Sequence, residues 1–189
     1  MAILIAGLVI FLGVHTLTTL RETRAGLISR LGEGPYKGLY SLVAAVGLGL
    51  IVWGFGTYRS GGYIPVWDPP TWTRHVAMLL VWIAFIALAA TYAPAGKIKG
   101  LLRHPMLNAV KFWALAHLLA NGDLGSIILF GSVLAWASWD RIAVRRRGDA
   151  GAPRVARFNR GDAIAVVVGT LAAVAMLFLH PIIIGVPII

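Results

Sequence analysis

Six long apolar runs dominate this sequence of 189 residues and constrain what it can fold into. They cover approximately residues 2–20, 38–57, 72–92, 105–121, 124–139 and 162–180. A helix of about 20 apolar residues spans the hydrocarbon core of a bilayer and satisfies its own backbone hydrogen bonds. A mean hydropathy of +0.82 and a charged fraction of 13% agree with this interpretation. We therefore predict an all-α integral membrane protein, with about six transmembrane helices in one bundle and a single domain over residues 1–189.

Two local patterns predict how these helices pack. The short Asn-Gly-Asp turn at residues 121–123 predicts that the fourth and fifth helices form a tight antiparallel hairpin. Small residues that recur at four-residue spacing let a neighbouring backbone approach closely. Such rows are formed by Ser41, Ala45 and Gly49 in the second run, and by Ala165, Gly169 and Ala173 in the sixth.

Lysine and arginine are concentrated in every second connection between the runs. Residues 21–37 carry four of them, residues 97–103 carry three and residues 141–160 carry seven. By the positive-inside rule these connections face the cytoplasm, and both termini face the periplasm. The same pattern accounts for the net charge of +10, so we predict membrane lipid, and no nucleic acid, as a partner. The predicted location is the bacterial inner (cytoplasmic) membrane, which the chain crosses several times.

The sequence contains no cysteine, which excludes disulfides, iron–sulfur clusters, thiolate catalysis and covalently attached c-type haem. Histidine remains the only good ligand for a soft metal or a haem iron. The seven carboxylates, Asp140 among them, lie near the predicted helix ends or in loops. We therefore predict no acidic group in the middle of the membrane and no acidic proton relay.

The fourth apolar run carries polar groups that lipid does not tolerate. It opens with an Arg103-His104-Pro105 turn and contains Asn108, Lys111 and His117. His104, Asn108 and Lys111 share one face at helical spacing. Ionisable residues at such depth usually face a bundle interior or a cofactor. We predict that part of a functional site lies here, and that Lys111 binds a haem propionate or another anion.

His15 and His117 are the two histidines with apolar residues on both sides inside predicted helices. Each could make an ordinary interhelical hydrogen bond. The pair could instead ligate a b-type haem, because neutral imidazole binds iron well. By depth in the membrane alone, His15 would pair with His104 rather than with His117. His75 and His180 lie near helix ends and are expected at the interface or as backbone caps.

Three motifs resemble the NnrU family of membrane proteins, which is named for nitrite and nitric oxide reduction. They are Gly13-Val14-His15 followed by Leu20-Arg21, the Arg-His-Pro turn, and the LAHLLANGD block at residues 115–123. Plant and cyanobacterial ζ-carotene isomerase is similar and shares this domain. By motif position, the resemblance implies haem b with His15 and His117 as axial ligands, and His104 as an alternate ligand. It implies a role in denitrification and nitric oxide metabolism, or a redox-linked, haem-dependent cis-trans isomerase, with a nitrogen-oxide-related or apolar polyene substrate.

Two other readings remain open. The first is a non-catalytic small-anion transporter or assembly factor without a cofactor. The second is an S-adenosylmethionine-dependent membrane methyltransferase, a class that shares the Arg-His-Pro turn. That class usually continues with Tyr-x-Gly and carries a Glu-Glu pair, whereas residues 106–109 here are Met-Leu-Asn-Ala and no Glu-Glu occurs.

Overall fold

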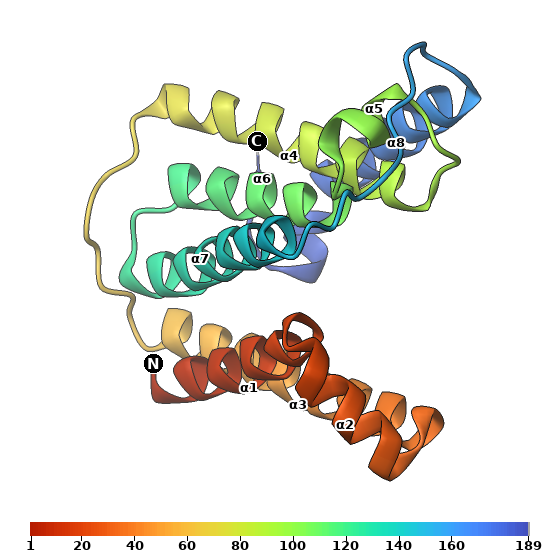
Figure 1. The fold of residues 1–189 in the computed structure, drawn as a ribbon. Helices are drawn as coiled ribbons and strands as arrows, with labels where there is room; N and C mark the ends of the chain where they lie inside the picture. The colour runs from red at the N-terminus through yellow and green to blue at the C-terminus, as the bar shows by residue number, and fades with distance from the viewer. Residues whose placement is uncertain (189) are drawn as a thin grey trace. The chain divides into compact units, whose positions relative to one another are not determined.

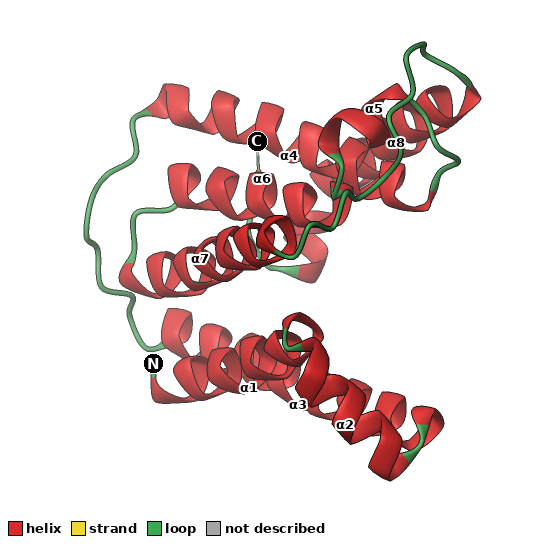
Figure 2. Ribbon diagram, viewed as in Figure 1, coloured by secondary structure: helices red, strands yellow, loops and turns green. Residues whose placement is uncertain are grey.

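A computed structural model describes residues 1–188 and places eight helices along them. The described residues contain no β-strand, only an isolated bridge between Pro65 and Asp123 (Figure 2). The all-α prediction is confirmed. The helices are α1 (Ala2–Thr19), α2 (Arg21–Leu31), α3 (Glu33–Ser60), α4 (Thr71–Tyr92), α5 (Lys97–Leu102), α6 (Pro105–Ala120), α7 (Leu124–Arg146) and α8 (Arg160–Ile183).

Five of these helices, α1, α3, α4, α7 and α8, are long and apolar enough to cross a membrane. The chain thus has the helices of a membrane protein. The fourth predicted span corresponds to α6, which has only 16 residues and is too short to be counted with them. The structure also adds two short helices, α2 and α5, within basic segments that the sequence placed in connections.

The chain divides into two compact units, each assembled from two stretches of sequence. Unit 1 contains residues 1–68 and 121–144, and unit 2 contains residues 69–120 and 145–189, of which Ile189 lies outside the described residues. Helices α6 and α7 belong to different units, so the predicted hairpin between them stays a prediction. The single domain over residues 1–189 likewise stays a prediction.

In unit 1, α1 and α3 run antiparallel in close contact (Figure 1). A Cβ atom added to Gly7 would lie 2.6 Å from the backbone nitrogen of Ile51, and one added to Gly47 would lie 2.8 Å from that of Phe11. Gly54 approaches the backbone of Leu4 in the same way. The two backbones therefore meet at glycines, which is how apolar helices pack tightly.

The small-residue row predicted for this helix was wrong. Ser41, Ala45 and Gly49 are exposed on α3, and no atom lies within 4 Å of a Cβ added to Gly49. Gly47 and Gly54 form the contact instead, on a different face of the helix. Because α3 contains small residues on several faces, spacing alone did not identify the face that α1 covers.

In unit 2, α4 packs against both α6 and α8 (Figure 1). The buried surface of α4 consists largely of alanine, and the indole N–H of Trp82 donates to the hydroxyl of Thr170 on α8 at 2.9 Å. A Cβ added to Gly169 would lie 2.5 Å from the Cα of Ile86 on α4. Ala165, one turn earlier, is 1% exposed. The close packing predicted at Ala165 and Gly169 is confirmed.

The carboxylate of Asp162 joins the start of α5 to the start of α8. One oxygen accepts the backbone N–H of Ile98 at 2.7 Å, and the other accepts those of Lys97 at 3.0 Å and Asn159 at 2.9 Å. Asn159 caps α8 in return, by accepting the N–H of Gly161 at 2.8 Å. A single buried carboxylate therefore satisfies backbone donors at two helix N-termini, where such donors lack partners and the helix dipole favours negative charge.

Gly47 and Gly49 provide a matched test of the α1–α3 contact. Gly47→Ala should destabilise the protein by roughly 1–3 kcal/mol, because the added methyl group forces the α1 backbone away. Gly49→Ala should be neutral or stabilising by up to about 1 kcal/mol, because alanine favours the helix. Thermal unfolding in detergent micelles measures both variants. Equal unfolding temperatures for the two would contradict the packing described here.

Asp162→Ala should destabilise unit 2, since three partly buried backbone N–H groups lose their acceptor. Each unsatisfied buried donor costs about 1–3 kcal/mol, and loss of a helix cap costs about 1 kcal/mol. Asp162→Asn keeps one acceptor oxygen and should lie between the alanine variant and the wild type. Thermal unfolding ranks the stabilities of the wild type and the two variants. An alanine variant as stable as the wild type would show that this carboxylate does not hold the two helices.

Candidate functional site

His15 lies near the end of α1 among three aromatic rings. Its Nδ1 hydrogen-bonds to the carbonyl of Phe11 at 2.6 Å. The imidazole centroid is 4.3 Å from the ring of Phe11, 5.5 Å from that of Tyr40 and 5.9 Å from that of Trp136. The residues thus come from α1, α3 and α7, and they give a half-buried imidazole flat apolar neighbours.

A polar network on α1 and α7 lies beside this histidine. The indole N–H of Trp136 donates to the hydroxyl of Thr16 at 3.2 Å, and the hydroxyl of Thr19 donates to the carboxylate of Asp140 at 2.5 Å. Thr19 is 6% exposed and Asp140 is 8% exposed. The expectation that every carboxylate lies near a helix end or in a loop was wrong for Asp140. The helix continues through it to Arg146, because the carboxylate finds a donor on α1 and can be buried.

His117 lies near the end of α6, in unit 2. Its Nδ1 hydrogen-bonds to the carbonyl of Trp113 at 2.8 Å, and the two ring centroids are 4.9 Å apart. The Nδ1 of His180 on α8 hydrogen-bonds to the carbonyl of Val186 at 2.7 Å.

The Arg103-His104-Pro105 turn is a strained junction between α5 and α6. Arg103 has a φ of 62° and a ψ of −48°, and the backbone N–H of His104 donates to the carbonyl of Leu102 at 2.6 Å. This is the rare γ-turn with positive φ, which side chains disfavour. The side-chain amide of Asn108 donates to the carbonyls of Leu102 at 2.9 Å and His104 at 3.2 Å, so it caps the junction.

His104 and Lys111 have no side-chain partner among the described residues. The Nε2 of His104 is buried without a hydrogen bond, and a Cβ added to Gly151 would lie 2.7 Å from it. Lys111 is half-buried on α6, and no hydrogen bond or ion pair of its ammonium group occurs in the described part of the chain. Its predicted role as a partner for a propionate stays a prediction.

The predicted site residues are thus distributed over both units. His15 belongs to unit 1, and the other five, Arg103, His104, Asn108, Lys111 and His117, belong to unit 2. The assignment of His15 and His117 as two axial ligands stays a prediction. Among the residues described, no group of three or more His, Cys, Asp and Glu side chains is placed to hold a metal ion.

The hydrogen bonds of His15 and His117 fit a role as metal-binding histidines. A carbonyl oxygen can only accept, so Nδ1 carries the proton in both residues, and the lone pair of the neutral ring lies on Nε2. A hydrogen bond from one ring nitrogen to a backbone carbonyl is the usual support of a metal-binding histidine. The flat aromatic neighbours of each ring are also compatible with a planar macrocycle.

The helical spacing of His15, Thr18, Thr19 and Glu22 predicts a polar face of this helix that looks into the bundle. Thr19 is buried as this predicts, whereas Thr18 and Glu22 are exposed. Nothing in the sequence indicated Tyr40, Trp136 or Asp140, because they reach this place from other helices.

Thr19→Val should destabilise the protein by about 1–3 kcal/mol, since a buried carboxylate loses a donor. Thr18→Val is the matched control, because the neighbouring Thr18 is exposed and bonds only to the carbonyl of His15. The double variant Thr19→Val, Asp140→Leu should recover part of the lost stability, because it also removes the carboxylate that has lost its donor. Thermal unfolding of the three proteins in detergent tests this, and equal effects of the two valine variants would contradict it.

Comparison with known proteins identifies the family. The family model described as NnrU protein matches residues 3–188. No curated protein matches the sequence, and no solved structure matches it. The match includes the Arg-His-Pro turn, both helical histidines and nearly all of both compact units. The chain therefore belongs to the NnrU protein family.

Proposed function

We propose that this NnrU protein binds haem b through the imidazoles of His15 and His117 and acts in nitrogen-oxide metabolism at the bacterial inner membrane. The observation that carries the proposal is the hydrogen bond from Nδ1 of each imidazole to the carbonyl four residues earlier, at 2.6 Å for His15 and 2.8 Å for His117. That bond selects the tautomer whose Nε2 can coordinate iron. Both termini face the periplasm in this proposal, as the basic connections favour, and α6 then crosses the membrane together with the five longer helices.

The surroundings of the two histidines support a macrocyclic ligand rather than a bare metal ion. Phe11, Tyr40 and Trp136 give His15 aromatic neighbours, and Trp113 does so for His117. The half-buried ammonium group of Lys111 suits an anionic propionate. A bound haem b would supply one-electron redox chemistry, which serves nitrogen-oxide conversion and also a redox-linked isomerisation of an apolar polyene.

The second candidate is a transporter of small anions without a cofactor. The observation that favours it is Lys111, which is half-buried on a short helix and has no partner among the described residues. Ionisable residues in membrane helices often mark a substrate path. Uptake of nitrite or nitrate into reconstituted vesicles that requires Lys111 would support this function, and tight vesicles would exclude it.

Absorption spectra of the purified protein test the haem proposal. Protein purified in mild detergent from haem-replete cells should show a stoichiometric b-type spectrum when oxidised and reduced. His15→Ala and His117→Ala should each lose most of the haem or change its spin state, because one ligand is missing. His104→Ala tests the alternate ligand.

His75→Ala is the matched control, since His75 is an exposed histidine on α4. It should keep the full spectrum. Folding of every variant is checked by size-exclusion chromatography, so that haem loss is not confused with unfolding. A colourless wild type, or full haem content in both the His15 and the His117 variants, would overturn the proposal.

A further inference from the structure

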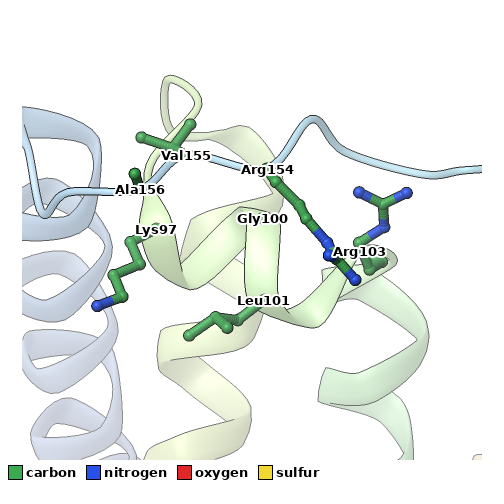
Figure 3. Close-up of a pocket in the computed structure, with 7 residues that line it drawn as sticks. All are labelled: Lys97, Gly100, Leu101, Arg103, Arg154, Val155 and Ala156. Carbon is green, nitrogen blue, oxygen red and sulfur yellow. The ribbon is translucent and has the colours of Figure 1, made fainter.

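A cavity of about 570 Å³ lies in unit 2 between α5 and the segment that precedes α8. Three of its lining residues are cationic, namely Lys97 and Arg103 at the two ends of α5 and Arg154 on the segment. Apolar surface from Leu101 and Val155 lines it as well (Figure 3). None of these residues except Arg103 belongs to the candidate site described above.

The backbone holds this cavity in a defined shape. A Cβ added to Gly100 would lie 2.7 Å from the carbonyl oxygen of Pro153, so the segment rests directly on α5. The N–H of Ala152 donates to the carbonyl of Arg103 at 2.7 Å. Gly151, with a φ of +65°, makes this approach possible. The side chains of Arg103 and Arg154 therefore project from fixed backbone positions.

Neither arginine of the cavity has a carboxylate partner among the described residues. Unit 2 contains only two carboxylates, Asp149 and Asp162. Asp162 accepts three backbone N–H groups, and Asp149 accepts the N–H of Gly151 at 2.9 Å. No ion pair joins Lys97, Arg103 or Arg154 to a carboxylate in the described part of the chain.

Lys99, by contrast, is already used within the fold. Its ammonium group donates to the carbonyls of Thr91 at 2.9 Å and Ala93 at 2.8 Å, and so caps the C-terminus of α4. Arg103 and Arg154 lie together on one side of the cavity, whereas Lys97 extends to the other side, with its ammonium group over the ring of Phe158 (Figure 3). Such a pair of arginines attracts an anion from outside the chain.

Exposed apolar side chains next to the cations indicate what kind of anion fits. Leu101 is 71% exposed, and Phe158 is 67% exposed with the ammonium group of Lys97 4.9 Å from its ring centroid. Guanidinium groups match the geometry of phosphate oxygens, and the apolar side chains suit a hydrocarbon chain. We propose that Arg103 and Arg154 bind the phosphate of an anionic phospholipid in this cavity, with the acyl chains passing over Leu101.

The proposal goes beyond haem binding and is tested separately from it. Delipidated protein in detergent is titrated with dioctanoyl phosphatidylglycerol, with dioctanoyl phosphatidylcholine and with inorganic phosphate, and thermal stabilisation is recorded. Phosphatidylglycerol should bind most tightly, because it carries both a net negative charge and acyl chains. Equal stabilisation by the two lipids would overturn the proposal, as would displacement of phosphatidylglycerol by equimolar inorganic phosphate, which would assign the cavity to a soluble phosphate.

Arg154→Gln and Arg157→Gln are a matched pair, since both remove one charge from the same segment and only Arg154 lines the cavity. Arg154→Gln should weaken binding of phosphatidylglycerol about tenfold, the effect of one charge-assisted hydrogen bond. Arg157→Gln should change it less than about twofold. Equal losses in the two variants would show a diffuse attraction and overturn the proposal.

Arg103→Gln gives a second variant if Arg154→Gln fails to fold, and it should weaken binding to a similar extent. The absorption spectrum is recorded for each variant. Arg154→Gln should retain the spectrum of the wild type, so a failure of lipid binding is distinguishable from a failure of haem binding.

Discussion

The geometry of unit 2 depends on one buried carboxylate. Asp162 is 4% exposed and accepts hydrogen bonds from residues that are far apart in the sequence, at the starts of α5 and α8. A charge at this depth is stable only because backbone N–H groups surround it. Through this bond the short helix α5 acquires a fixed position, although six residues are too few to form a stable helix alone. The cavity beside α5 and the strained turn after it both depend on that position.

Much of the helical architecture could be predicted from the sequence, because apolar runs and helix length are local properties. The close contact at Gly169 was predicted for the same reason, because α8 carries a row of small residues at four-residue spacing. The contact between α1 and α3 could not be predicted. Gly47, Gly49, Gly54 and Gly56 lie on several faces of α3, and only the position of α1 decides which of them is covered.

In the candidate site, too, local features could be predicted from the sequence and contacts between helices could not. Residue type and spacing identified His15 and His117 as unusual groups within apolar helices, and the structure adds the hydrogen bonds that determine their tautomers. The partners of His15 come from α3 and α7, at sequence distances that no periodic pattern covers. Asp140 was misjudged because a carboxylate beside Arg141 resembles a helix end. Its burial depends on Thr19, which lies 121 positions earlier in the chain.

The hydrogen bond that each helical imidazole makes to its own helix has a mechanical consequence. Because Nδ1 is tied to a carbonyl one turn earlier, the ring cannot reorient independently, and its direction is determined by the rotation of the helix about its axis. One residue of rotation changes that direction by about 100°. A small turn of α1 or α6 would therefore be enough to move the Nε2 atom toward or away from whatever it binds.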